Sequence, residues 1–479
     1  MNLWEWEDLE ESLEELLLSL EYSEIIPEKI SSFSLKRNEE QRIVLTTQSV
    51  AGRKPEEVIL GRVYKNESKV SLKSPYGEGV LRGVSHLRTE TDYLDHSSTP
   101  TKTTYEIQSI EFKHKTERIT THTIDYIANL PEHFIWPNGY TDEVTHTKTR
   151  SYMGAPSVEL RTAKSKKNLV RDSLRLRIGE IEIVVGRSKT GRDGVERPGY
   201  ILYTGQTDVT YRRRIQDCLS FAFGTPLVHF GHSSHCKDGY ITELASISPN
   251  TVNGRAWSIA SAPPAPITDG RGSTNILNED LFQRVAKGLF DNIESYNLDR
   301  LPWRLWHADT SPYFMRPAYY GALIEGLQNK YIEDTKNKIS STIIEKGEYR
   351  KIRPTLLKLL SKQIVDQKAK ELFIEKINSG NTASLKIISQ RFYSTLNLTL
   401  GDLEISAWNK RNDAAHGNEI SEDDQVMFIR ETKALKVMLN RIILRITNGS
   451  DDYIDYFTYN HPSRPLNEAI PIEKENAND

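Results

Sequence analysis

Three side chains that can act on a phosphodiester are gathered in one short segment near the end of the chain. The segment 411–417 has the sequence RNDAAHG, in which Arg411, Asn412 and His416 offer a permanent cation, an amide and an imidazole. An imidazole moves protons near neutral pH, and a guanidinium holds a phosphate in a fixed fork. Such groups can cleave RNA without a metal ion. The spacing therefore indicates a phosphate site, with Arg411 as clamp, His416 as proton carrier and Asn412 as orienting group.

The elements around this segment decide how its side chains can meet. Residues 403–415 have helical character, and Gly417 is placed to end the helix. Asn412 and His416 are four residues apart and share a helix face, whereas Arg411 and His416 are about 140° apart around the axis. One regular helix cannot bring both to one phosphate. We expect the helix end to fray or, preferably, a symmetric dimer to set two Arg–His pairs in one cleft.

In such a cleft the expected reaction is attack by a ribose 2′-hydroxyl on the adjacent phosphate. One His416 takes the hydroxyl proton, the other protonates the leaving 5′-oxygen, and Arg411 stabilises the added negative charge. The products would be a 2′,3′-cyclic phosphate and a 5′-hydroxyl end. An alternative stays open, in which Arg411 and His416 only offset the dipole at a helix C-terminus. A second Arg–His pair, Arg300 and His307, lacks the following Asn and favours a loop that enters a helix.

Length and composition bound the class of protein. The chain has 479 residues, 37% of them hydrophobic, which predicts about two to four domains. Its formal net charge is −3 at pH 7, so any nucleic-acid contact must depend on a local basic patch. The two cysteines, Cys218 and Cys236, argue against a disulfide framework and favour a cytoplasmic location. No run of about 18 apolar residues occurs, so we expect no membrane span.

The pattern of apolar residues predicts an α+β protein. Residues 1–265 hold short runs rich in Val, Ile, Thr and Tyr, which predict a β-rich sandwich or barrel preceded by a helix at 5–21. Pro, Gly and Ser then predict a linker at 266–277. Helical spacing dominates 278–448 and indicates a bundle of about six helices. Residues 449–479 form a polar, Pro-containing tail, which we expect to wrap the surface or fray.

The segment RNDAAH resembles the R-N-x3-H motif of the HEPN superfamily, whose helical bundles dimerise and often act as metal-independent ribonucleases. The segments 392–396 (FYSTL) and 319–327 (YYGALIEGL), and the apolar helix after His416, also resemble this domain. The resemblance covers roughly residues 278–448. A β-rich half followed by a HEPN bundle is similar to the ApeA-type anti-phage proteins, and the segment 219–227 (LSFAFGTPL) is similar to the end of their N-terminal domain.

This resemblance implies an all-α HEPN endoribonuclease domain that cuts RNA, with tRNA as the expected substrate, to halt growth of an infected cell. It implies a homodimer or higher even-numbered oligomer, and a β-rich half that senses a phage-derived trigger or restrains the nuclease. It implies no cofactor. Two alternatives stay open. One is a HEPN bundle without catalysis that docks or binds nucleotides in a larger complex, and the other is an RNA-binding or transcription regulator.

Basic residues near the motif are the expected contacts to the RNA backbone, because lysine and arginine bind phosphates with release of counterions. We assign this role to Lys410 beside the motif and to Arg350, Lys351 and Arg353 in the helical half. Two further basic groups, the run 161–177 and the triplet 212–214, would either support the ends of the RNA or form solvated loops.

The segment 229–236 (HFGHSSHC) holds four possible zinc ligands, His229, His232, His235 and Cys236. Zinc prefers four such ligands in a tetrahedron. The spacing matches no common zinc motif, however, and no second pair of ligands occurs elsewhere in the chain. We therefore favour a strand and turn with exposed histidines, and we assign no metal ligand.

Overall fold

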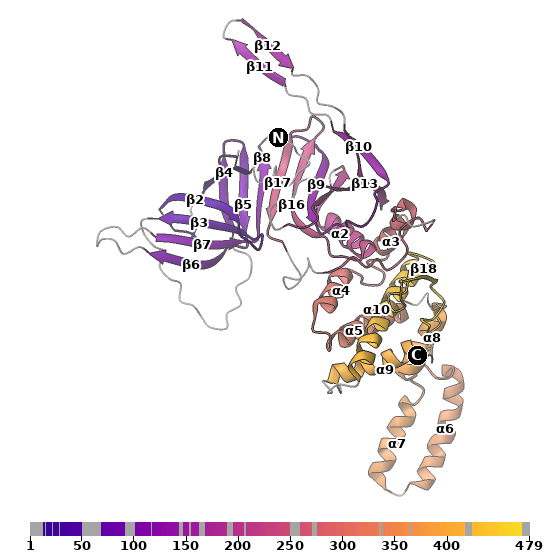
Figure 1. Cartoon of the computed structure of the whole chain (residues 1–479). Helices are drawn as coiled ribbons and strands as arrows, with labels where there is room; N and C mark the ends of the chain where they lie inside the picture. Colours follow the sequence, from indigo (N-terminus) through magenta and orange to yellow (C-terminus); the bar gives the residue numbers. More distant parts are fainter. Residues whose placement is uncertain are drawn as a thin grey trace. The chain divides into compact units, whose positions relative to one another are not determined.

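The structure is a computed structural model of the chain (Figure 1). It describes residues 13–14, 16–21, 23–27, 29–49, 69–91, 101–115, 117–142, 147–152, 155–161, 168–188, 195–205, 207–249, 259–270, 275–334, 337, 339–364, 366–416 and 424–471. For residues 91, 142–170 and 412–416, the structure describes at most the backbone and no side chain. The chain divides into two compact units, Met1–Phe290 and Asp291–Asp479, and each is described by itself.

The first unit is built from antiparallel strands. They are β1 (Ser19–Leu20), β2 (Ile30–Arg37), β3 (Ile43–Ser49), β4 (Lys69–Ser74), β5 (Gly77–Arg82), β6 (Ser85–Thr91), β7 (Thr101–Ile107), β8 (Ser109–His114), β9 (Thr120–Ala128), β10 (Asn138–Asp142), β11 (Thr147–Tyr152), β12 (Ala155–Arg161), β13 (Asn168–Ile178), β14 (Ile181–Arg187), β15 (Gly199–Thr204), β16 (Val228–Cys236) and β17 (Ile241–Ile247). An eleven-stranded sheet has the order β1-β4-β5-β8-β17-β16-β9-β15-β14-β13-β10. A four-stranded sheet has the order β2-β3-β7-β6, and β11 pairs with β12 alone.

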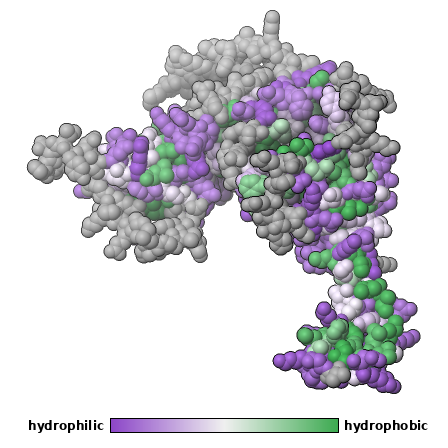
Figure 2. Space-filling view, turned by 60° about the horizontal axis from the view of Figure 1, so that its bottom comes forward, coloured by the Kyte–Doolittle hydropathy of each residue, from purple (hydrophilic) through white to green (hydrophobic). Residues whose placement is uncertain are grey.

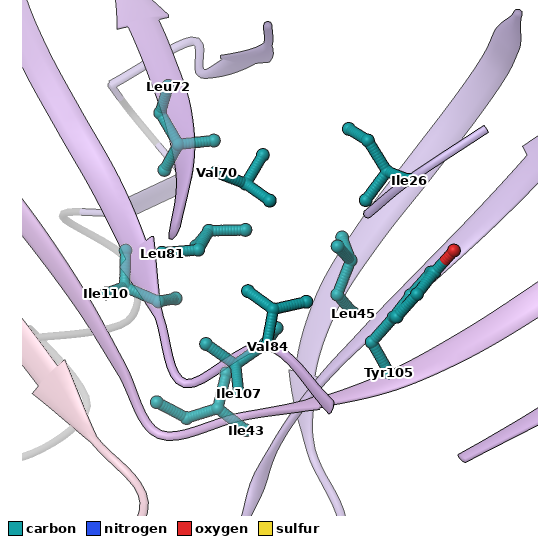
Figure 3. Close-up of a cluster of buried hydrophobic side chains, with 10 residues drawn as sticks. All are labelled: Ile26, Ile43, Leu45, Val70, Leu72, Leu81, Val84, Tyr105, Ile107 and Ile110. Carbon is teal, nitrogen blue, oxygen red and sulfur yellow. The ribbon is translucent and has the colours of Figure 1, made fainter. Parts of the chain in front are cut away.

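The core of this unit includes a cluster between the four-stranded sheet and one end of the large sheet (Figure 3). β3 and β4 alternate buried and more accessible residues, as expected of strands with one face on a core. Leu45 of β3 and Val70 of β4 are fully buried in it. Its other members are Ile26, Ile43, Leu72, Leu81, Val84, Tyr105, Ile107 and Ile110. Burial of each such side chain contributes about 1.5–3 kcal/mol, which holds the two sheets together.

The described part of the first unit also contains the helices α2 (Val209–Phe223) and α3 (Glu279–Asp291). Asp208 caps α2 by accepting hydrogen bonds from two backbone amides of its first turn, and Gly224 ends it with a left-handed φ of 63°. The rings of Phe223 and Phe282 join the two helices at 4.4 Å between centroids. The expected linker, residues 266–277, lies inside this unit, because Ile276 bridges to Ile135 and Leu277 is buried. The expected helix at 5–21 falls mostly outside the described residues, and β1 lies near its end.

The second unit is helical. Its elements are α4 (Leu301–Thr310), α5 (Arg316–Glu333), α6 (Lys346–Gln363), α7 (Gln367–Ser379), α8 (Leu385–Thr395), α9 (Asp402–His416) and α10 (Gln425–Thr447), followed by β18 (Asp452–Ile454) and β19 (Ser463–Pro465). Helices α5, α9 and α10 pack on one another. α10 is the most deeply buried of the described helices, since most residues after Phe428 lie in the interior. α6 and α7 pack on each other as a hairpin (Figure 1).

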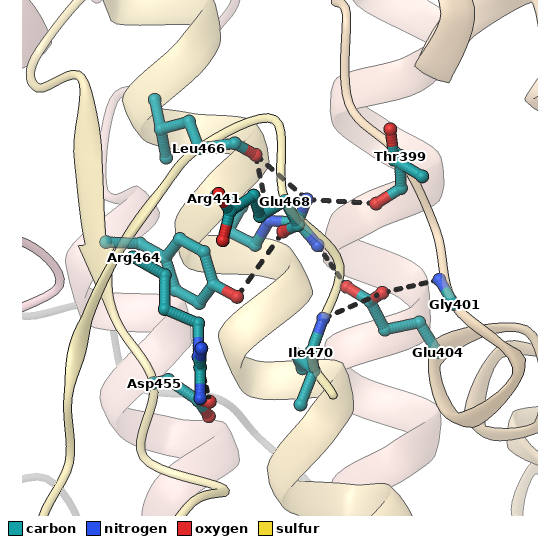
Figure 4. Close-up of polar contacts among 10 residues, drawn as sticks. Thr399, Gly401, Glu404, Arg441, Asp455, Arg464, Leu466, Glu468 and Ile470 are labelled. Atoms are coloured by element: carbon teal, nitrogen blue, oxygen red, sulfur yellow. Dashed lines mark hydrogen bonds and ion pairs between the residues drawn. The ribbon is translucent and has the colours of Figure 1, made fainter. Parts of the chain in front are cut away.

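Residues after α10 fold back on the bundle. β18 pairs with β19, and Tyr453, Leu466 and Ile470 are buried. Arg441 of α10 donates hydrogen bonds to the Leu466 carbonyl and forms a fully buried ion pair with Glu404 of α9 (Figure 4). Glu404 also accepts a bond from the Ile470 amide at 3.3 Å. The tail through residue 471 is therefore part of the packed unit and does not fray.

A β-rich region of antiparallel strands precedes the helices in the chain, so the prediction of an α+β protein is confirmed. None of the helices in the described ranges is long and apolar enough to cross a membrane.

Candidate functional site

Arg411 lies in the C-terminal half of α9, and its guanidinium is held on three sides. Nη1 donates to the Trp408 carbonyl at 2.5 Å, and Nη2 pairs with Oε1 of Glu325 on α5 at 2.5 Å. The guanidinium carbon lies 3.5 Å from the centre of the Trp408 ring, in a cation–π contact. The Arg411 side chain is 13% exposed, whereas that of Glu325 is 49% exposed. The cation is thus fixed in direction, and its acidic partner borders solvent.

One face of α5 is shaped to receive this arginine. Gly321 and Glu325 are four residues apart and so share a helix face. A Cβ atom built on Gly321 would lie 2.7 Å from Cδ of Arg411, closer than a real Cβ approaches another heavy atom. Gly321 therefore leaves room for the stem of Arg411, and Glu325 meets its charged end. The segment 319–327 contains both positions.

A cavity of about 970 Å³ opens beside Arg411, among α5, α8 and α9. Arg411, Glu325 and Trp408 form part of its wall. Amide side chains are frequent in the remainder of the lining, and they are Gln328, Asn329, Gln390, Asn397 and Asn409. Amides offer both donors and acceptors, and the apolar residues between them offer a surface for a flat ring. The lining suits a ligand with an anionic group and a planar, hydrogen-bonding part.

Tyr393 of α8 is part of the lining of this cavity, and its hydroxyl is buried. Its Oη is buried and, within the described part of the chain, has no hydrogen-bond partner. Burial raises the pKa of Tyr393 well above its usual value, and the nearby Glu404 carboxylate raises this pKa further. The phenol therefore remains protonated and can donate a hydrogen bond. The segment 392–396 is one of those on which the resemblance in the sequence depends, but no residue spacing predicted Tyr393 as a site residue.

Asn412 and His416 follow Arg411 on the same helix, and their side chains lie outside the described residues. The backbone of α9 remains helical through His416. The helix therefore does not fray before His416. On a continuous helix, positions 411 and 416 are about 140° apart around the axis.

Lys410 forms a specific ion pair within the unit. Its ammonium lies 3.3 Å from Oε2 of Glu431 on α10, and Glu431 is 5% exposed. The other oxygen of Glu431 accepts a hydrogen bond from Ser406 at 2.7 Å. Lys410 thus balances a buried carboxylate, and its assignment to RNA binding stays a prediction.

Arg350, Lys351 and Arg353 lie exposed on α6, and none of them lines the cavity around Arg411. No described residue of α6 or α7 is buried. Apolar side chains lie exposed between the basic ones, and they gather on the hairpin in the lowest part of Figure 2. They include Ile352, Leu356, Leu359, Leu372 and Phe373. The hairpin therefore presents a mixed basic and apolar surface.

The segment 229–236 lies in β16 of the first unit, and its four possible zinc ligands do not come together as one group. His229 and His232 lie beside Asp125 of β9, whereas His235 bonds to Ser233 at 2.9 Å. Cys236 lies at the end of β16, outside the group formed with Asp125. The expectation of exposed histidines is wrong for His232 and His235, which are 8% and 7% exposed.

Asp125 is a buried charge that the sequence did not indicate. Arg212 of α2 places Nε at 3.0 Å from Oδ1 of Asp125, and both side chains are almost fully buried. Arg212 is therefore not part of a solvated basic patch. Burial opposes the ionisation of Asp125, but attraction to His229 and Arg212 outweighs it and lowers the pKa of Asp125 to about 2. Burial and the charge of Arg212 lower the pKa of His232 to about 3.

The basic run at 161–177 falls largely outside the described side chains, and Arg175 and Arg177 at its end are exposed.

Two clusters of described residues combine charge, burial and polar atoms without a regular hydrogen bond, one around Arg411 and one around Asp125. No family model, no curated protein and no solved structure matches this chain.

Proposed function

We propose that the second unit is a metal-independent endoribonuclease of the HEPN type, in which Arg411 binds the phosphate that is cleaved. The supporting observation is the fixed, nearly buried guanidinium in the wall of a cavity large enough for a nucleotide. A cation that is already oriented stabilises the developing charge of the transition state without reorganising first. This is the property that phosphate-cleaving sites need.

Glu325 is the group that a phosphate would replace. It pairs with Arg411 at 2.5 Å but is half-exposed, so it can turn into solvent at a small cost, because exposed ion pairs are worth about 0–1 kcal/mol. A phosphate then accepts the hydrogen bonds that Nη2 of Arg411 donates to Glu325. The Trp408 ring and carbonyl keep the guanidinium in place during this exchange.

The proton carrier in this proposal is His416 of a second copy. A continuous α9 places positions 411 and 416 too far apart around the helix to serve one phosphate from one chain. In a homodimer, one imidazole removes the proton from the 2′-hydroxyl while that oxygen bonds to phosphorus. The bond from phosphorus to the 5′-oxygen breaks, and the second imidazole protonates that oxygen. A 2′,3′-cyclic phosphate and a 5′-hydroxyl result, and Asn412 orients the imidazole.

The cellular role that we propose is defence against phage. The chain would cut RNA in the cytoplasm of an infected cell, with tRNA as the favoured substrate, and so stop growth. The first unit would respond to a phage-derived trigger. Arg350, Lys351, Arg353 and Lys410 would hold the RNA outside the cleavage site.

A second candidate function is nucleotide binding without cleavage. The amide-rich lining of the cavity favours it, because amide side chains suit the edge of a base as well as a phosphodiester. A docking module of this kind would keep the cavity and Arg411 but would not depend on His416.

The experiment that separates the two uses purified full-length protein and tRNA in buffer containing EDTA. Nuclease function predicts fragments with 2′,3′-cyclic phosphate ends, detected by end-specific ligation and sequencing. Arg411→Ala and His416→Ala should each abolish these fragments, while circular dichroism shows an unchanged fold. Cleavage that requires a divalent cation, or full cleavage by His416→Ala, would rule out the proposed mechanism. The docking module would be favoured by two results together: the purified chain binds nucleotide, and no RNA is cut in infected cells that contain it.

A further inference from the structure

Strand pairing in the first unit brings two histidines and an aspartate onto one face of the large sheet. Asp125 of β9 pairs directly with His232 of β16, so their side chains share a face. His229 is three residues before His232, and in a regular strand it would face the other way. The pairing shifts by one residue between His229 and Gly231, which marks a β-bulge or similar irregularity. This extra residue returns His229 to the side of Asp125.

The three side chains are spaced as metal ligands are. One ligand atom from each of Asp125, His229 and His232 lies within 4.8 Å of the others. Nε2 of His229 is 3.7 Å from Oδ1 of Asp125, which is too long for a direct hydrogen bond. A zinc ion binds histidine nitrogen and carboxylate oxygen at about 2.0–2.2 Å, and it fits between two atoms at that separation. The gap is therefore of the size that one shared cation bridges.

The same three side chains hold polar atoms that lack a regular hydrogen bond among the described residues, although Arg212 forms an ion pair with Asp125. Asp125 is 1% exposed and His232 is 8% exposed. Oδ1 of Asp125, Nε2 of His229 and Nδ1 of His232 are buried, and none of the described residues forms a regular hydrogen bond with them. An unsatisfied buried polar group costs about 1–3 kcal/mol, and more when it is charged. Three such atoms in one cluster of described residues favour a bound ion that accepts their lone pairs.

We propose that Asp125, His229 and His232 bind one Zn²⁺ ion in the first unit. Two imidazoles and one carboxylate are a known ligand set for zinc with a fourth position left for a water molecule or another ligand. The proposal concerns the first unit and does not depend on ribonuclease activity in the second.

Arg212 has a supporting role at this site. Its Nε approaches Oδ1 of Asp125 at 3.0 Å, and its Nη1 donates to the Thr207 carbonyl at 2.9 Å. Outer partners of this kind orient the carboxylate that binds a metal. Arg212 by itself favours an anion at the site, but the carboxylate of Asp125 in the centre of the cluster opposes one. With the charges of Arg212 and Asp125 balanced, two imidazoles remain, and imidazole is a preferred ligand of zinc.

A cavity lies beside one of the three proposed ligands. His232 also lines a cavity of about 650 Å³ in the first unit. Glu111, Glu243 and Lys113 border the same cavity. We infer that a water molecule or a small ligand with an oxygen or nitrogen donor enters from this cavity, past His232, to the fourth position. This places a ligand-binding metal in the unit for which we propose a sensing role.

Zinc binding is measured on untagged, full-length protein that has been stripped with a chelator. Equilibrium dialysis against Zn²⁺ and elemental analysis should give one ion per chain. His229→Gln and His232→Gln should each weaken binding at least about tenfold. His235→Gln and Cys236→Ser are matched controls on the same strand and should bind as the wild type does. Thermal unfolding without metal identifies any variant that has failed to fold.

Cobalt provides a second readout that is independent of affinity. Co²⁺ in the wild-type site should give visible absorption bands typical of four or five ligands, and His229→Gln should change or remove them. Wild-type protein that binds no zinc at micromolar concentrations overturns the proposal. So does equal binding by His229→Gln and His232→Gln, or loss of binding in His235→Gln alone. Binding of inorganic phosphate in place of zinc would also overturn it and show that Arg212 dominates.

Discussion

The carboxylate of Glu325 on α5 lies 2.5 Å from Nη2 of Arg411 on α9, although 86 residues separate the two in the chain. Their exposures differ, since Glu325 is half-exposed and Arg411 is nearly buried. Arg411 is further held by the ring and carbonyl of Trp408, whereas Glu325 borders solvent. The glutamate is thus the movable member of the pair, and it competes with any phosphate for the guanidinium.

Glu325→Gln should therefore bind RNA more tightly than the wild type. The substitution removes a negative charge from the mouth of the site and leaves the Arg411 charge unpaired. We expect affinity for tRNA to rise several-fold at low salt, in line with about 0–1 kcal/mol for an exposed ion pair. Filter binding measures it on a His416→Ala background, so that no RNA is cut. Glu333→Gln is the control, because Glu333 pairs with Lys330 on the same helix. Equal affinity of all three proteins would mean that Glu325 does not compete with phosphate.

Gly321→Ala should lower RNA cleavage about 10- to 100-fold while leaving the helix intact. The added methyl group would lie 2.7 Å from Cδ of Arg411, so the arginine must move from its place over α5. A displacement of about 1 Å at a catalytic group can reduce a rate by about a hundredfold. Gly326→Ala on the same helix is a close control, since no described atom beyond the backbone of its own helix lies within 4 Å of its Cβ position. Cleavage rates of the two variants are compared on one tRNA substrate. If Gly321→Ala cuts as fast as Gly326→Ala, the fixed position of Arg411 does not matter for the reaction.

Arg441→Ala should destabilise the second unit by about 3–5 kcal/mol, because it leaves the buried carboxylate of Glu404 without its partner. The same change removes the hydrogen bonds from Arg441 to the carbonyls of Leu466 and Thr399, which hold the tail on the bundle. Denaturant unfolding of the full chain measures the loss in the transition of the second unit. Lys433→Ala on the exposed side of α10 is the control, with an expected change within about 0.5 kcal/mol. A loss below 1 kcal/mol would show that the ion pair contributes little to stability.

Periodic elements were predictable from the sequence, because their signal is local. The helical spacing expected for 278–448 includes Phe428, Leu435, Leu439 and Ile442, which are seven, four and three residues apart and are buried in α10. The short runs rich in Val, Ile, Thr and Tyr predicted a β-rich half, and β3 is one of its strands. Each of these patterns identifies the face of a helix or strand that must be buried, but it does not identify the element that packs on that face.

Long-range polar contacts were not predictable, because they have no fixed spacing. Arg411 was named from its motif, but nothing in the sequence connects it with Glu325. Asp125 was missed as a partner of His229 because 104 residues separate them, and because a shift in strand pairing brings His229 to the same face. The tail was expected to wrap the surface or fray. Its packing against α10 was not predictable, because Arg441 binds the backbone carbonyl of Leu466, which leaves no signature in the side-chain sequence.

The first unit should lose stability as pH falls, and His235 should account for part of that loss. Burial lowers the pKa of His235, and the nearby charge of His122 adds to this, while a hydrogen bond to the Gly239 carbonyl partly offsets it. In the unfolded chain the same imidazole titrates near its usual pKa of about 6.5. Between the lowered pKa and about 6.5, the unfolded chain binds more protons than the folded one, so stability falls as pH decreases through this window.

His235→Gln removes this contribution, so its melting temperature should fall less than that of the wild type between pH 7.5 and pH 5.5. Differential scanning calorimetry of the full chain follows the transition of the first unit at both pH values. His86→Gln serves as the control, because His86 is exposed on β6 of the same unit and should keep the wild-type dependence on pH. A larger fall in melting temperature for His235→Gln than for the wild type would contradict this prediction, because it would mean that the folded chain favours the protonated imidazole. Parallel pH dependence in all three proteins would place the acid sensitivity of this unit on other groups.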